Sequence, residues 1–139
     1  MTAATVAYPA AAGPQFGNKL PNVGLTAYTL SHAWLTAETN EVNDTVEFGY
    51  LPGNVTVVGL MNYCADLDSN VSPTLTHTIK IGSTSIVTED DLCQTGGGEF
   101  HVITPQALTA PTKVSVVTTA GAATHANGTQ YLTFLYYSS

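Results

Sequence analysis

The sequence predicts an all-β fold: a single antiparallel β-sandwich or jelly roll, preceded by an extended N-terminal arm. Short apolar segments with a period of two recur from residue 25 onward, and no segment has the period of a long helix. The 22 threonines are β-branched and suit the exposed side of a pleated strand. A length of 139 residues favours one domain. A closed barrel is the alternative with the same number of strands.

Residues 1–24 differ in composition from the rest, and we expect them to form the arm. Pro9, Pro14 and Pro21 exclude a continuous helix, and intervening glycines interrupt any strand. Four apolar side chains are spaced along this segment and are candidate interface residues: Tyr8, Phe16, Leu20 and Val23. Such an arm suits docking onto a neighbouring chain, where it orders on binding. A disordered or folded-back leader remains equally open.

The folded domain is expected over residues 25–139. Its first strands are predicted at Leu25–Thr36, Thr45–Leu51, Val55–Ala65 and Pro73–Ile81. Val55–Ala65 is apolar on both faces, which predicts a central strand covered on both sides. In Pro73–Ile81, apolar residues and His77 share one face, while threonines and a lysine share the other. This alternation predicts a half-buried strand, with His77 as a hydrogen-bonded core or interface residue.

The later strands are predicted at Ser85–Val87, Phe100–Ile103, Lys113–Thr119 and Gln130–Tyr137, giving seven or eight in all. Residues 88–91 (TEDD) resemble a helix N-cap with acidic residues in the first turn. The glycines at 96–98 would end that helix after about one turn, as a flexible loop. Residues 120–129 suit a long hairpin connection between the last two strands.

The charge of the chain excludes several classes of partner. It contains no arginine, only Lys19, Lys80 and Lys113 are cationic, and the net charge is -7. Phosphate recognition needs clustered cations, so neither nucleic acid nor an anionic membrane surface is an expected partner. The N-terminus lacks the charged and apolar regions of a signal peptide, and no apolar run is long enough to span a membrane. We therefore expect synthesis in the cytoplasm.

Cys64 and Cys93 are the only cysteines. A disulfide between them is open, but cytosolic synthesis favours two reduced thiols. No two histidines have a metal-ligand spacing, which predicts no zinc site. Residues 66–70 (DLDSN) open like a calcium loop, yet Val71 and His77 stand where an EF-hand needs glycine and glutamate. A looser calcium site at Asp66 and Asp68 and a simple polar turn both remain open.

No catalytic constellation is apparent. The chain has no nucleophile elbow, its acidic residues cluster in predicted turns, and the glycines at 96–98 are not followed by the lysine of a phosphate loop. We predict a protein that is not an enzyme, with no cofactor. Its tyrosines and Trp34 exceed what one core strand pair needs, and aromatics with few charges are typical of interface centres. Trp34 therefore joins the interface candidates.

Three motifs carry a resemblance to a known family: residues 51–59 (LPGNVTVVG), residues 66–70 with 73–76 (DLDSN and PTLT), and residues 128–137 (GTQYLTFLYY). Over roughly residues 26–137 the chain resembles capsid decoration or cement proteins of tailed bacteriophages, many from cyanobacterial and marine hosts. The resemblance implies a β-sandwich or jelly roll, a homotrimer, the virion surface as location and the major capsid protein as partner. A host-surface carbohydrate-binding module or head fibre is the alternative, with Trp34 or the Tyr136–Tyr137 pair stacking on sugars.

Overall fold

The computed structural model describes residues 24–35 and 40–139. These residues form eight strands and one 3-10 helix: β1 (Thr26–Trp34), β2 (Thr45–Leu51), β3 (Val55–Cys64), β4 (Thr76–Ile81), β5 (Thr84–Asp90), η1 (Leu92–Gln94), β6 (Gly97–Leu108), β7 (Thr112–Ala120) and β8 (Gly128–Ser138). Almost all of the predicted arm, residues 1–23, lies outside the described residues.

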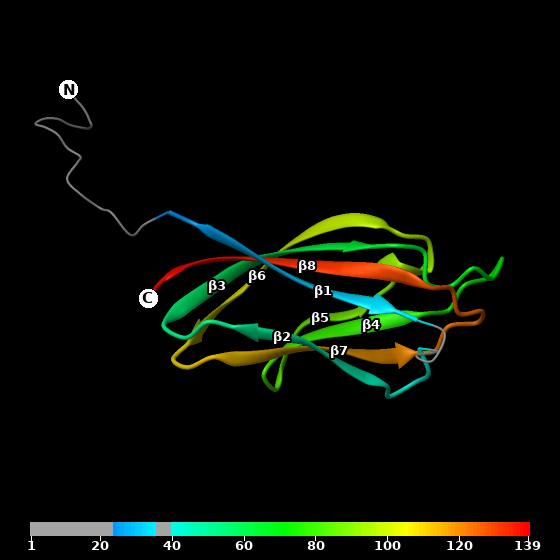
Figure 1. The fold of residues 1–139 in the computed structure, drawn as a ribbon, viewed down its shortest axis with the longest axis horizontal. Coiled ribbons are helices and arrows are strands. Elements are labelled where there is room, and N and C mark those ends of the chain that lie inside the picture. The colour runs from blue at the N-terminus through cyan, green and yellow to red at the C-terminus, as the bar shows by residue number, and fades with distance from the viewer. Residues whose placement is uncertain (1–23, 36–39) are drawn as a thin grey trace, which may run out of the picture.

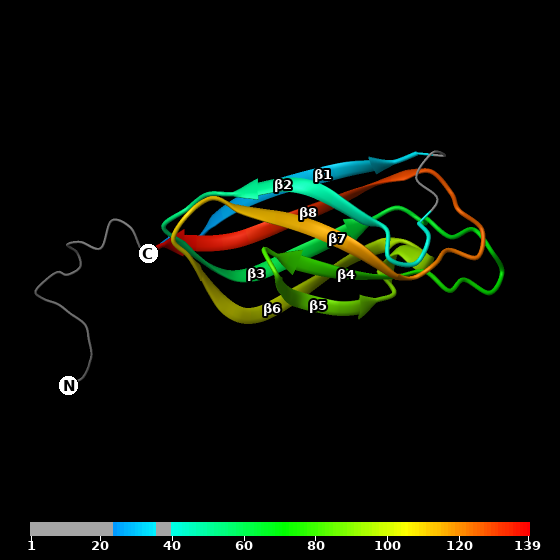
Figure 2. The same ribbon diagram turned by 90° about the horizontal axis from the view of Figure 1, so that it is seen from below.

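The strands form two antiparallel sheets stacked face to face (Figures 1 and 2). The first sheet has the order β1-β8-β3-β6, and the second has the order β2-β7-β4-β5. The chain changes sheet at every connection except the one from β4 to β5, which gives the two-sheet jelly-roll arrangement. The predicted sandwich is thus confirmed, and the closed barrel is wrong.

The connection after β7 corrects one prediction. Residues 120–129 are not a hairpin, because β7 pairs in the second sheet and β8 pairs in the first. This segment therefore crosses from one sheet to the other at one end of the sandwich. Turn-forming residues alone do not tell a hairpin from such a crossing, since both need the same local bends.

The segment around β5 corrects two more predictions. β5 continues to Asp90 and pairs with β4, so Thr88 lies within a strand rather than at a helix N-cap. In place of the predicted helix turn, the 3-10 helix η1 follows β5. Asp91 is at the N-cap position of η1 and makes no side-chain capping bond. The predicted glycine loop is also shorter, because Gly97 and Gly98 are already part of β6 and pair with β3. Pairing with a neighbouring strand here outweighs the local signals.

A β-bulge between Val57 and Gly59 decides which side of β3 faces the core. Past the bulge the alternation shifts, so Val57 and Leu60 both lie buried while Met61 and Tyr63 point outward. The predicted central position of β3 is confirmed. The predicted cover on both faces is not, because Met61 and Tyr63 are 44% and 54% exposed in the described part of the chain.

His77 is a core residue, as its strand pattern predicted. It is 1% exposed, its Nε2 lies 2.8 Å from Asn40 Oδ1, and its ring stacks on Trp34 with centroids 5.2 Å apart. Burial lowers the pKa of His77 to about 4, although the charge of Asp90 acts in the opposite direction. The ring is therefore neutral at physiological pH.

Cys64 and Cys93 form a disulfide, so the expectation of two reduced thiols is wrong. β3 ends at Cys64 and η1 contains Cys93, and their Cα atoms lie 5.6 Å apart, within the normal range for a disulfide. The bond ties the end of a central strand to the segment that joins the two sheets. Sequence spacing could not reveal this proximity, because 29 residues separate the two cysteines.

Candidate protein-docking surface

The outer side of the first sheet carries a group of exposed large side chains from β3, β6 and β8. We call this group the aromatic face: Met61, Tyr63, Phe100, Val102, Tyr131 and Tyr137. Their exposed fractions range from 38% to 84%. Contiguous exposed apolar surface of this kind marks interaction sites in soluble proteins more often than scattered apolar residues do.

The strand register brings these side chains together. Met61 lies opposite Phe100, and Tyr63 lies opposite Tyr131, with the two tyrosine rings 6.2 Å apart. Gly59 lies beneath Phe100, because a Cβ added there would stand 3.0 Å from the phenyl ring. A glycine at this point of the central strand therefore allows Phe100 to lie across the sheet.

The aromatic face carries no charge. Glu99 is the only acidic residue in the four strands of the first sheet, which contain neither lysine nor arginine. Glu99 and Phe100 are successive residues of β6, so they point to opposite sides of the sheet, and Glu99 points inward. Interface centres are depleted in charged residues and enriched in tyrosine, phenylalanine and methionine. The composition of this surface is that of a protein-docking surface.

The predicted interface residues occupy different places. Tyr8, Phe16, Leu20 and Val23 lie outside the described residues. Trp34 is 1% exposed and donates a hydrogen bond from its Nε1 to Gln130 Oε1, 3.1 Å away, so its role in the folded domain is in the core. Of the aromatic face, the three tyrosines belong to the aromatic residues that exceeded the needs of the core and pointed to an interface, whereas Met61, Phe100 and Val102 were not predicted. The missing signal was the bulge in β3, which turns Met61 and Tyr63 outward.

Asp68 closes a turn rather than opening a calcium loop. Its carboxylate accepts hydrogen bonds from four backbone N–H groups at 2.8 to 3.2 Å; the donors are Thr74, Leu75, Ala123 and Thr124. Burial alone would raise the pKa of Asp68, but these four bonds outweigh it and lower the pKa to about 2. The bonds use both carboxylate oxygens, so the polar-turn interpretation accounts for this motif.

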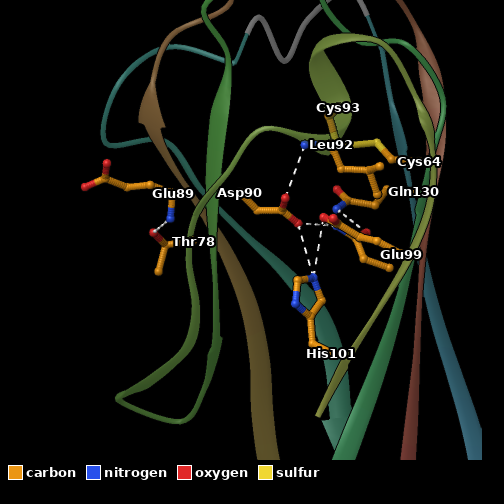
Figure 3. A network of polar contacts seen from close by, with 10 residues as sticks. Cys64, Thr78, Glu89, Asp90, Leu92, Cys93, Glu99, His101 and Gln130 are labelled. Carbon is orange, nitrogen blue, oxygen red and sulfur yellow. Dashed lines mark hydrogen bonds and ion pairs between the residues drawn. A yellow bond between two sulfur atoms is a disulfide. The ribbon is translucent and has the colours of Figure 1, made fainter. Parts of the chain in front are cut away.

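A second polar group was not anticipated from sequence. Asp90, Glu99 and His101 converge between β5 and β6, with their potential ligand atoms all within 4.8 Å of one another (Figure 3). Histidine spacing, on which the zinc prediction rested, does not reveal a cluster of one histidine and two carboxylates. The spacing Glu99-x-His101 on one side of a strand was the available signal.

No protein-family model and no curated protein matches this chain. Solved structures do match. The chain is similar to one in the cyanophage Pam1 capsid asymmetric unit, with a TM-score of 0.73, 21% identity and 92% of both chains covered. It is also similar to a chain in the capsid of Ralstonia phage GP4, with a TM-score of 0.70, 24% identity and 90% of both chains covered.

A third similar chain is in the acid-stable capsid structure of Helicobacter pylori bacteriophage KHP30, with a TM-score of 0.54, 11% identity, and 84% of this chain and 89% of that one covered. These comparisons define a class of fold: a jelly roll that is also present in chains of three phage capsid structures. Within the described residues, no helix is both long and apolar enough to cross a membrane.

Proposed function

We propose that this chain is a virion structural protein, without enzymatic activity, that binds the outer surface of a phage capsid. It cements or decorates the shell by bridging neighbouring major capsid protein subunits. The observation that carries the proposal is the uncharged aromatic face on the first sheet. The likeness of the fold to chains in two phage capsid structures and the resemblance to cement proteins support the same role.

The partner surface follows from the chemistry of the aromatic face. A face without charged side chains binds most strongly to a surface that is also uncharged and partly apolar, since a buried unpaired charge on the partner would cost several kcal/mol. A four-stranded sheet also holds its outward side chains in fixed positions, so docking needs little ordering. We therefore propose an uncharged apolar patch on the major capsid protein as the occupant of this face.

The arm supplies a second contact in this proposal. Residues 1–24 carry spaced apolar side chains and precede β1, which begins at Thr26. When the aromatic face is docked, the tethered arm is held close to the neighbouring subunit, and its effective concentration there is high. The arm then bridges to the neighbouring subunit even though each of its own contacts has low affinity. A homotrimer, which the resemblance implies, would multiply these contacts further.

The carbohydrate-binding alternative is weaker in the folded domain. Trp34 is buried and cannot stack on a sugar. Tyr136 and Tyr137 are successive residues of β8 and therefore point to opposite sides of the sheet. Tyr136 packs near Tyr28 with ring centroids 6.4 Å apart, and only Tyr137 belongs to the aromatic face. The two candidate sugar platforms are thus not assembled.

The direct test uses shells assembled from the major capsid protein that accompanies this chain, prepared without the chain. We expect the purified protein to co-sediment with them in stoichiometric amount and to raise the temperature at which they disassemble. A glycan array and a titration with free capsid protein serve as comparison. Failure to bind the shells, with no effect on their stability, would rule the proposal out, and strong binding to a glycan would favour the alternative.

A truncation after Gly24 separates the two proposed contacts. Light scattering of the full chain and of residues 25–139 measures whether each is a trimer, and circular dichroism checks that the shorter chain keeps its β structure. We expect the truncated chain to bind the shells more weakly, because it retains the aromatic face and loses the arm. Unchanged binding would show that the arm takes no part.

A further inference from the structure

The aromatic face leaves one cluster of side chains unexplained. Asp90 lies at the end of β5, and Glu99 and His101 lie on the inward side of β6 (Figure 3). β5 is an edge strand of the second sheet and β6 is an edge strand of the first. The three side chains therefore meet where two different sheets come together along one open side of the sandwich.

The distances in this cluster fit a metal ion. His101 Nε2 lies 3.4 Å from Glu99 Oε2 and 3.7 Å from Asp90 Oδ2. For bonds of about 2.0 to 2.2 Å, a tetrahedral site separates its ligand atoms by about 3.4 Å. The observed separations are close to that value, and all the ligand atoms lie within 4.8 Å of one another. Little movement would be needed to bind an ion between them.

Two of the three ligand atoms lack a hydrogen-bond partner. His101 Nε2 and Glu99 Oε2 are buried and form no hydrogen bond with the described residues, although buried polar atoms are normally satisfied. Neither β5 nor β6 contains a lysine or arginine to balance the two carboxyl groups.

The third ligand is held in place by a chain of buried hydrogen bonds. Asn62 Nδ2 donates to Asp90 Oδ2 at 3.0 Å, and Gln130 Nε2 donates to Asn62 Oδ1 at 3.0 Å. Trp34 Nε1 in turn donates to Gln130, and the N–H of Leu92 donates to the other oxygen of Asp90 at 3.2 Å. Outer partners of this kind orient the ligands of protein metal sites and raise their affinity.

We propose that Asp90, Glu99 and His101 bind one divalent transition-metal ion, of which Zn²⁺ is the representative, and that this ion joins the edges of the two sheets. One imidazole with two carboxylates suits Zn²⁺, Co²⁺ or Ni²⁺, whereas Mg²⁺ and Ca²⁺ prefer sites made of oxygen atoms only. A water molecule completes the fourth position. This site does not depend on the proposed docking function, and it differs from the absence of a metal site predicted from the sequence.

The test uses the full chain without a purification tag, freed of metal with EDTA. Calorimetric titration with Zn²⁺ is expected to show one site per chain, and the Tm is expected to rise with Zn²⁺ concentration. Glu99→Gln and His101→Gln should each weaken Zn²⁺ binding at least about tenfold. The control variants Glu47→Gln and His125→Gln change a glutamate and a histidine outside the cluster and should bind as the wild type does.

Co²⁺ supplies a second measurement that does not depend on stability. A site with one nitrogen and two oxygen ligands should give visible absorption bands, and His101→Gln should lose them while keeping its circular dichroism. Equal binding of Zn²⁺ by the wild type and both cluster variants would overturn the proposal, as would no binding at all. Binding of Ca²⁺ or Mg²⁺ as strong as that of Zn²⁺ would also overturn it, because His101 would then not be a ligand.

Discussion

The two outer faces of the sandwich differ in chemistry although they belong to one fold. The first sheet presents the uncharged aromatic face. The second sheet presents what we call the threonine face: Thr76, Lys80, Lys113 and Thr119. There Thr76 Oγ1 lies 2.8 Å from Thr119 Oγ1, and Lys113 Nζ lies 3.3 Å from Glu47 Oε2. The threonine face therefore carries polar and charged groups that suit contact with water, whereas the aromatic face has the composition of a docking surface.

This contrast shows that the two-sheet scaffold alone does not decide the chemistry of its outer faces. Both faces come from antiparallel strands with alternating side chains, so the outward positions alone differ. Both lysines in the described residues lie on the second sheet. Cross-strand pairs of threonine and of opposite charges contribute to sheet stability without a partner. The aromatic pairs leave large apolar areas in water, and covering those areas is favourable.

Both outer faces exist only while the sandwich is folded. Asp68→Asn is expected to destabilise the fold most. An asparagine has one acceptor oxygen where Asp68 uses two to accept five backbone bonds from two loops, counting a longer one from Asn70. Charge-assisted bonds contribute about 1.5 to 3 kcal/mol each, so we expect a loss of about 4 kcal/mol in unfolding free energy. Urea denaturation followed by tryptophan fluorescence measures this loss.

Asp66→Asn is the matched control for that variant. Asp66 is exposed and accepts one bond, from the N–H of Asp68 at 3.0 Å, which asparagine can also accept. Its loss should stay near 0.5 kcal/mol or below. If the two variants were equally stable, the role assigned to the Asp68 carboxylate would be incorrect. If Asp68→Asn is destabilised as expected, a loss of docking by this variant reflects unfolding and says nothing about either face.

The disulfide is expected to have the next largest effect. Cys64 and Cys93 are 29 positions apart, so breaking their bond gives the unfolded chain more conformational freedom. In the loop-entropy description, this gain lowers the unfolding free energy by about 3 kcal/mol. Cys64→Ala with Cys93→Ala should therefore lower the urea midpoint, and dithiothreitol should lower that of the wild type by a similar amount. In the variant without the disulfide, the two sheets should still unfold together in one urea transition. A variant as stable as the oxidised wild type would show that the bond contributes nothing.

A direct test replaces two aromatic side chains of the first sheet with threonine, the residue typical of the outer face of the second sheet. Tyr63→Thr with Phe100→Thr places threonine on the first sheet and keeps residues that suit a strand. Removing two central aromatic side chains should weaken docking to capsid shells about 100-fold, while the unfolding free energy changes by less than about 1 kcal/mol. Co-sedimentation and urea denaturation measure the two effects separately.

Tyr50→Thr is the control for the aromatic face, because Tyr50 is 53% exposed in β2 of the second sheet. It should leave docking unchanged. If Tyr50→Thr weakened docking as much as the double variant, the binding surface would include both sheets, and the contrast between them would not explain the function.

Much of the fold followed from the sequence, because period-two alternation needs only local information. The strand at Pro73–Ile81 illustrates this, since Ile79 and Ile81 proved buried and Lys80 proved outward as predicted. The face of β3 did not follow. A single bulge after Val57 reverses the sides of Met61 and Tyr63 relative to Val55, and Gly59 beside it was the one available signal of a bulge in that strand.

The long-range sites could not be predicted for a related reason. The Cys64–Cys93 bond and the Asp90, Glu99 and His101 cluster join segments whose closeness depends on sheet order. The same holds for Asp68, whose motif is local but whose donors at Ala123 and Thr124 come from a crossing connection. Composition predicted an excess of aromatic side chains, and only the register shows that several of them lie exposed on one sheet.

Acid should weaken the sandwich through Asp68. The pKa of Asp68 in the folded protein is about 2, below the ordinary aspartate value of 3.8, so the stabilisation is complete above about pH 4 and is lost as pH falls through 2. After allowance for solvent screening the loss is about 1 to 2 kcal/mol. Urea midpoints measured from pH 5 to pH 2 should fall for the wild type and change less for Asp68→Asn.

The smallest effect is expected on the threonine face itself. Glu47→Gln removes the ion pair with Lys113, in which both side chains are about half exposed. Exposed pairs contribute about 0 to 1 kcal/mol and are screened by salt, so the unfolding free energy should fall by at most about 0.5 kcal/mol, and less at high salt. Docking to shells should not change. A docking loss in this variant, with stability preserved, would mean that the partner contacts the second sheet and would move the binding surface away from the aromatic face.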